Sequence, residues 1–108
     1  MTKRGEIYWI NEGNPVGGEI RKRRPGIIVT NDAMASRLNR LTIVPTTTKK
    51  IDKVYATEAV VTVGGRQSKA QADQITTVAR QRLGDRIGAL SGTDMALVEA
   101  AVRTYLVL

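Results

Sequence analysis

Short stretches of β-branched and aromatic residues, separated by turns rich in glycine, proline and polar residues, make up most of this 108-residue chain. They recur roughly every 8–12 residues, a spacing typical of small all-β domains. No internal repeat or low-complexity linker divides the chain, so we expect one domain spanning residues 1–108. This pattern favours a small, curled antiparallel barrel. The expected strands cover residues 5–10, 26–30, 41–46, 54–63, 66–78 and 83–89.

The C-terminal segment changes from strand to helix periodicity. Ser91 is a suitable N-cap, and Asp94 three residues later completes a pattern resembling a capping box. Apolar residues then recur every three or four positions, which predicts one amphipathic helix that packs on the core or in a dimer rather than binding a cofactor. The fold class is therefore mainly β with a C-terminal helix. The helical stripe consists of Met95, Val98, Ala101, Val102 and Tyr105.

The connecting segments also carry specific signals. Residues 11–24 contain four consecutive cations and read as a long loop, and residues 31–40 read as a turn or a short helix. Pro45 places its strand at a sheet edge or at a strand end, because proline cannot donate a ladder hydrogen bond. Gly64 and Gly65 predict a hairpin.

The charge of the chain is strongly basic and uneven. Seventeen Lys and Arg residues against ten Asp and Glu leave a net charge of +7, of which residues 1–53 hold +6. The centre of this charge is the run from Arg21 to Arg24. Such a patch attracts polyanions, although a solvated charged loop would have the same composition.

The residues that are missing exclude several kinds of chemistry. The chain has no cysteine and no histidine, which removes disulfides, thiolate sites, Ser-His triads and almost all zinc hydrolase sites. The carboxylates are scattered, and no phosphate-loop pattern occurs, so we expect neither a metal nor a cofactor. Without cysteine, a signal peptide or a membrane-length apolar run, the expected location is cytoplasmic.

Two places concentrate the remaining groups that suit polyanion chemistry. Arg24 precedes Pro25, which restricts it to extended conformations and orders a guanidinium fork able to bind two phosphate oxygens. Thr46, Thr47 and Thr48 follow Pro45, where a strand ends, and their hydroxyls can donate to phosphate oxygens. Threonine is also common in strands and turns for structural reasons alone.

The chain resembles the MazF/PemK toxin family over essentially its whole length. The tail from Arg82 through Ser91 to the terminal helix is similar to that family as well. Six further segments share its order and spacing: Arg4-Gly5-Glu6-Ile7-Tyr8-Trp9, Gly18-Glu19, Arg24-Pro25-Gly26-Ile27-Ile28-Val29, Asn31-Asp32, Val44-Pro45-Thr46-Thr47-Thr48 and Asp73-Gln74-Ile75.

The resemblance implies a toxin of a type II toxin–antitoxin system with an SH3-like β-barrel (CcdB/PemK-like) that works as a homodimer. It implies a metal-independent, sequence-specific endoribonuclease that cleaves single-stranded RNA. In such a reaction the ribose 2′-OH attacks the adjacent phosphorus, giving a 2′,3′-cyclic phosphate or 3′-phosphate and a 5′-OH end. The implied partner is a cognate antitoxin with an acidic, disordered segment.

The resemblance also implies roles for individual residues. Arg24 matches the family's catalytic arginine, Thr47 and Thr48 match its hydroxyl residues, and Glu19 or Asp73 is the general base, a choice that the sequence leaves open. Thr76 stands where relatives often have a basic residue and Gln71 where some have an arginine, which indicates an altered cleavage preference or a reduced activity. Gly18 also departs from the family pattern, because it replaces the usual serine. The residues expected to contact RNA are Arg21, Lys22, Arg23, Lys49, Lys50 and Gln74.

Two other functions compete with this one. A CcdB-like toxin would have the same barrel but act by binding DNA gyrase, whereas the intact Arg24-Pro25 pair and the threonines after Pro45 favour the nuclease branch. A catalytically inactive module that binds RNA or an antitoxin would have the same charge pattern. Only a measurement of activity separates that module from the nuclease.

Overall fold

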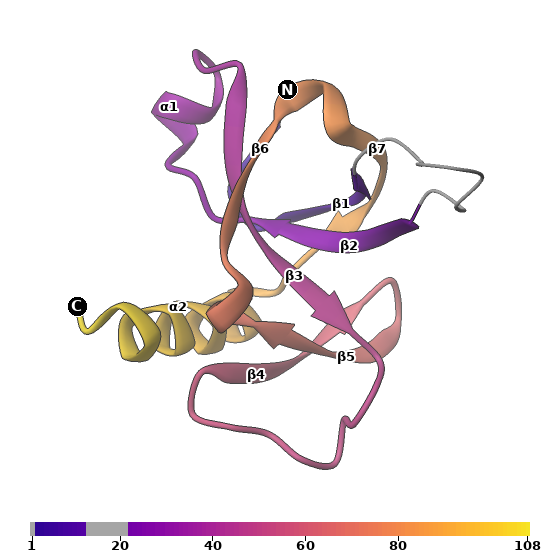
Figure 1. Cartoon of the computed structure of the whole chain (residues 1–108), viewed down its shortest axis with the longest axis vertical. Helices are drawn as coiled ribbons and strands as arrows, with labels where there is room; N and C mark the ends of the chain where they lie inside the picture. The colour runs from indigo at the N-terminus through magenta and orange to yellow at the C-terminus, as the bar shows by residue number, and fades with distance from the viewer. Residues whose placement is uncertain (1, 13–21) are drawn as a thin grey trace, which may run out of the picture.

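The computed structural model describes residues 2–12 and 22–108, and its strands form one curled antiparallel sheet with the order β4-β5-β3-β2-β1-β7, in which β6 pairs with β3. The sheet curls into a half-barrel, with a C-terminal helix packed beside β4 (Figure 1). The strands are β1 Glu6–Glu12, β2 Lys22–Ile28, β3 Arg40–Thr47, β4 Glu58–Val63, β5 Arg66–Gln71, β6 Thr76–Ala79 and β7 Leu83–Ala89. The helices are α1 Asp32–Ala35 and α2 Gly92–Leu106, with 3₁₀ turns η1 Ala72–Gln74 and η2 Arg80–Arg82. The expected fold class is thus confirmed.

Strand β3 runs through the middle of the sheet and changes partner along its length. Its first half pairs with β6 through Ile43, and its end pairs with β5 from Thr46 onward. Pro45 lies between these two ladders, where its missing N–H removes no bond to either strand. Of the two alternatives predicted for Pro45, the sheet edge is wrong, because β3 is central in the sheet, whereas Pro45 does lie near the strand end, two residues before Thr47. The partner change makes a proline acceptable in this central strand.

Two apolar clusters fill the curled sheet. The larger lies between the sheet and α2, and centres on Ile7, Ile27, Val44 and Val98. The smaller lies on the other side of the strands, around Ile28, Leu41 and Ile43. Full burial of such side chains contributes about 1.5–3 kcal/mol each.

Helix α2 begins as the sequence predicts. The Ser91 hydroxyl accepts a 3.1 Å hydrogen bond from the Asp94 backbone N–H. The Asp94 carboxylate accepts a 2.9 Å bond from the Thr62 N–H, which ties the helix to β4. Val98 and Ala101 are buried, whereas Tyr105 is exposed. In the part of the chain that the structure describes, no helix is both long and apolar enough to cross a membrane.

Several strand boundaries differ from the predictions. Strand β2 begins at Lys22, so Arg23 and Arg24 lie in a strand opposite Asn11 and Ile10 of β1 rather than in a loop. Backbone pairing outweighs the charge of these side chains, and the Arg23 guanidinium lies 4.5 Å from the centre of the Trp9 ring. Residues 66–78 form two strands separated by η1, and β4 begins only at Glu58.

Candidate functional site

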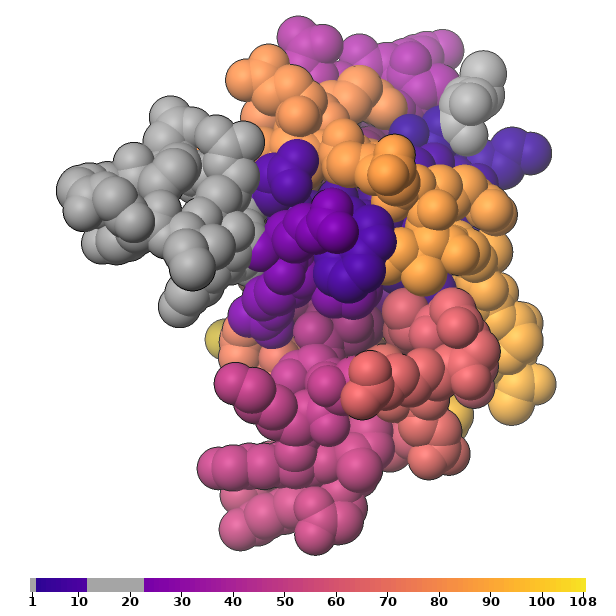
Figure 2. All heavy atoms as spheres, turned by 90° about the vertical axis from the view of Figure 1, so that its right-hand side faces the viewer, coloured from indigo at the N-terminus to yellow at the C-terminus, as the bar shows by residue number. Residues whose placement is uncertain are grey.

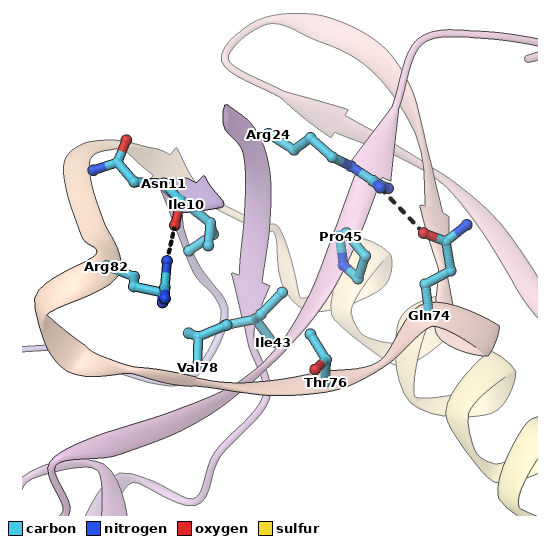
Figure 3. Close-up of a pocket in the computed structure, with 9 residues that line it drawn as sticks. All are labelled: Ile10, Asn11, Arg24, Ile43, Pro45, Gln74, Thr76, Val78 and Arg82. Atoms are coloured by element: carbon cyan, nitrogen blue, oxygen red, sulfur yellow. Dashed lines mark hydrogen bonds between the residues drawn. The ribbon is translucent and has the colours of Figure 1, made fainter. Parts of the chain in front are cut away.

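A cavity of about 270 Å³ is lined by residues of β1, β2, β3 and β6 and of the turns η1 and η2, and two arginines contribute to its wall. Figure 3 shows Arg24 and Arg82 on opposite sides of this space, above apolar side chains. An apolar base beneath charged groups lowers the local dielectric and strengthens their interaction with an anion. The lining residues are Ile10, Asn11, Arg24, Ile43, Pro45, Gln74, Thr76, Val78 and Arg82.

Two glutamine side chains orient Arg24. Its Nη2 donates to Gln71 Oε1 at 2.7 Å, and its Nη1 donates to Gln74 Oε1 at 3.1 Å. Gln71 ends β5 and Gln74 lies in η1, so both partners come from a segment almost fifty residues later in the chain. Arg24 itself lies in the paired strand β2, so the residue is held at its backbone by strand pairing and at its guanidinium by the two glutamines.

Sequence reasoning did not single out Arg82 as a functional residue. It lies in η2, and its Nη1 donates to the Asn11 carbonyl at 3.3 Å (Figure 3). Arg80 in the same turn is not among the residues that line the cavity, and it donates to the Leu38 carbonyl at 3.1 Å. The alternation of two arginines just before a strand was the available signal, but only the fold shows which of them reaches the cavity.

The threonine triplet lies at the end of β3, beyond Pro45. The buried Thr46 hydroxyl donates to the Pro25 carbonyl at 3.3 Å. The Thr47 hydroxyl accepts a 3.2 Å bond from the Lys49 N–H, which leaves its hydrogen available to donate elsewhere. Thr48 is exposed, and neither Thr47 nor Thr48 lines the cavity.

The other candidates are distributed around this region. Asp73 is exposed in η1, next to Gln74 but outside the cavity lining, while Lys49 and Lys50 are exposed after β3. Glu19 and Arg21 lie outside the described residues, as does the side chain of Lys22. The structure therefore brings Gln74 to Arg24 but shows no contact between Arg24 and Asp73.

Two of the three positions that depart from the family pattern belong to this site, and the third, Gly18, lies outside the described residues. Gln71 binds Arg24, and Thr76 lines the cavity. Among residues 2–12 and 22–108, no three acidic, cysteine or histidine side chains come together as a possible metal site.

Comparison with known proteins identifies relatives over the full chain. The chain is 38% identical over 115 residues to Endoribonuclease MazF9 of Mycobacterium tuberculosis, covering 98% of this chain and 97% of that protein. It is 30% identical over 113 residues to Endoribonuclease EndoA of Bacillus subtilis, covering 100% and 97%.

Solved structures share the fold. A mycobacterial endoribonuclease in complex with its cognate antitoxin superposes with a TM-score of 0.85 at 24% identity, covering 100% of this chain and 97% of that one. A MazE–MazF structure from Deinococcus radiodurans superposes with a TM-score of 0.84 at 20% identity, covering 99% and 96%. A family model described as PemK-like, MazF-like toxin of type II toxin-antitoxin system matches residues 3–106, and the chain therefore belongs to this toxin family.

Proposed function

We propose that this toxin is an endoribonuclease that cleaves single-stranded RNA at the Arg24 cavity without a metal ion. The observation that supports this most directly is Arg24 itself, held by Gln71 and Gln74 at the rim of a cavity that also contains Arg82. Two guanidiniums around one small cavity suit a phosphodiester, because each fork can bind two non-bridging oxygens. The names of the curated relatives, which are endoribonucleases, point to the same activity.

The proposed reaction is an internal transesterification. The ribose 2′-oxygen forms a bond to phosphorus while the bond to the 5′-oxygen breaks, and a 2′,3′-cyclic phosphate remains. The 2′-OH proton passes to a carboxylate, either Asp73 or Glu19, and the departing 5′-oxygen takes a proton from Arg24. Because the 2′-OH is the nucleophile, DNA is not a substrate.

Arg24 acts mainly through its charge. Attack adds negative charge to the non-bridging oxygens, and an oriented guanidinium stabilises that charge more than it stabilises the ground state. Thr47 and Thr48 add hydroxyl donors from the end of β3. As a base Arg24 is unsuitable, because a guanidinium has only donors and no acceptor for the 2′-OH proton.

The RNA chain follows the basic residues around the cavity. Arg23 presents one guanidinium face to Trp9, and its exposed position leaves the group accessible to RNA. Lys49 and Lys50 are exposed just past the end of β3, directly after the threonines. We assign Arg21, Lys22, Arg23, Lys49 and Lys50 to the phosphates that flank the cleaved bond.

Two protein partners complete the proposal. A cognate antitoxin with an acidic, disordered segment folds along the same basic surface and blocks RNA. A second copy of the chain packs on the apolar end of α2, where Leu106, Val107 and Leu108 are exposed beside a cavity of about 280 Å³. Exposed apolar groups that are contiguous in this way are typical of protein interfaces.

Cleavage of a long mixed-sequence RNA in excess EDTA tests the activity. We expect discrete cuts with 5′-OH ends, and Arg24→Ala should slow them by about 10²–10³-fold, as is typical for loss of one transition-state donor. Arg37→Ala is the matched control, because it removes the same charge from an exposed position in the turn after α1. If the unmodified chain binds RNA without cutting it, the enzyme assignment is wrong and the inactive module replaces it.

A further inference from the structure

Strand β5 carries a buried lysine that the proposed reaction does not use. Lys69 is only 4% exposed, and its ammonium group forms an ion pair with Glu58 at 3.3 Å. Its Nζ also donates to two backbone carbonyls, that of Lys50 at 3.1 Å and that of Lys53 at 2.9 Å. Lysine is rarely buried unless it is paired, and here its three donors have three oxygen partners.

All three partners of Lys69 belong to, or border, the segment between β3 and β4, residues 48–57. Glu58 at its end also accepts a 3.0 Å bond from the Tyr55 N–H, so one carboxylate joins the lysine to the segment's backbone. Lys50 has a left-handed φ of 52°, a conformation that L-residues rarely adopt, and its carbonyl is one of the two that Lys69 binds. The buried ammonium therefore holds this segment in an otherwise unfavourable shape.

The held segment lies next to the proposed catalytic hydroxyl. Lys69 is the direct partner of Thr47 in the β3–β5 ladder, and the Thr47 hydroxyl accepts from Lys49 within the same segment. Two residues further along β5, Gln71 binds Arg24. In Figure 2 the segment forms the lower end of the face shown, below the hairpin of β4 and β5.

The segment exposes groups that suit RNA. Lys49, Lys50 and Lys53 are exposed, and Lys53 lies 5.6 Å from the ring centre of the exposed Tyr55. Lysines bind phosphates, and an exposed aromatic ring offers a face on which a base can stack. A fixed backbone places these groups at a set distance from Thr47, whereas a mobile backbone would let them adapt to RNA of any sequence.

We propose that Lys69 is a positioning residue for substrate specificity. Its ammonium fixes residues 48–57 as a rigid wall that selects the nucleotides beside the cleaved phosphate. The inference rests on the proposed function, because it assigns a role in recognition of the RNA that the Arg24 cavity cleaves. Lys69 itself is buried and does not contact the substrate.

Lys69→Met tests this role, since methionine keeps the length and apolar stem but removes the charge and the donors. Arg66→Met is the control, because it removes one charge from an exposed position on the same strand. A second variant, Lys69→Met with Glu58→Gln, avoids leaving a buried carboxylate without its cation and keeps an acceptor for Tyr55. The readouts are the cut sites on a long mixed-sequence RNA, and kcat and KM on one preferred oligonucleotide.

We expect both Lys69 variants to raise KM by about tenfold or more and to cut additional sites, with kcat within about threefold of the unmodified chain, because the Arg24 contacts are untouched. Arg66→Met should keep the original cut sites. Folded Lys69 variants that are merely less thermostable, with unchanged cut sites and KM, would overturn the inference. A fall in kcat at constant KM would overturn it as well. Failure of the unmodified chain to cut any RNA would instead refute the proposed function, and the recognition role would fall with it.

Discussion

Arg24 and Gln71 are joined by a 2.7 Å hydrogen bond between strands that are 47 residues apart in the chain. The bond connects a charged group on β2 with an uncharged amide at the end of β5, and Gln74 adds a second contact at 3.1 Å. Because both amides are uncharged, these two contacts orient the guanidinium without themselves neutralising it. The Arg24 site therefore depends on β5 as much as on β2.

Loss of Gln71 should impair chemistry more than binding. In Gln71→Leu the guanidinium loses the oxygen that fixes its Nη2, and a poorly oriented donor stabilises the transition state less. We expect kcat for RNA cleavage to fall by about tenfold, which corresponds to about 1.4 kcal/mol, with little change in KM. Gln67→Leu, at an exposed position on the same strand, is the matched control. A wild-type kcat in Gln71→Leu would mean that Gln71 does not orient Arg24.

Arg82 should contribute mainly to substrate binding. In Arg82→Ala the cavity loses one of its two guanidiniums, so KM should rise by about tenfold. The slope of log affinity for RNA against log salt concentration should become shallower by the amount expected for about one phosphate contact. Arg82→Lys keeps the charge but not the fork, and should restore only part of the affinity. Fluorescence anisotropy with labelled RNA at several salt concentrations measures both effects. An unchanged salt slope in Arg82→Ala would exclude a phosphate contact.

The part of the fold that could be predicted from sequence is the part that local chemistry determines. Ser91 begins α2, and Gly64 and Gly65 form the β4–β5 hairpin with left-handed φ values of 58° and 81°. The break at Ala72 could not be predicted, because the polar residues around it suit a strand as well as a turn. It arises where the chain leaves β5 and returns along the other half of β3 as β6.

The candidate site likewise contains some residues that local sequence identifies and others that only the fold reveals. Arg24 could be singled out because Pro25 follows it in a recognisable local motif. Arg82 could not, and Gln71 could be noted only as a departure from the family pattern, since the contacts of both depend on segments that are far apart in sequence. Lys69 is the extreme case, because a lysine among polar neighbours reads as exposed and only the fold shows its burial.

The apolar end of α2 should control dimerisation. Leu106 is 46% exposed, and it lies beside Val107 and Leu108, which are 89% and 81% exposed. Leu106→Glu places a charge in the proposed interface, and burying an unpaired charge is strongly unfavourable. We expect sedimentation analysis to show a dimer for the unmodified chain and a monomer for the variant. Thr104→Glu, two residues earlier at an exposed position that borders β4, should remain a dimer.

Stability should fall in acid because of Glu6. Its carboxylate accepts bonds from the Lys3 N–H at 2.6 Å, from Tyr8 at 3.0 Å and from Arg86 at 2.8 Å. Burial acts to raise the pKa of Glu6, but these bonds outweigh it and hold the pKa below its ordinary value. Burial and the contact with Glu6 raise the pKa of Tyr8, so both act to keep its hydroxyl a donor toward alkaline pH.

A lowered pKa in the folded state means that folding favours the ionised carboxylate. The stabilisation is therefore complete above the unfolded pKa of about 4.3 and disappears as the pH falls through the lower folded value. Glu6→Gln should reduce stability by about 1–2 kcal/mol near neutral pH, because bonds to a charged acceptor are replaced by weaker ones. The difference in urea midpoint between the two proteins should shrink steadily below about pH 4. A difference that stayed constant down to strong acid would show that the Glu6 charge does not contribute, because protonation of the carboxyl would then leave the stability of the unmodified chain relative to Glu6→Gln unchanged.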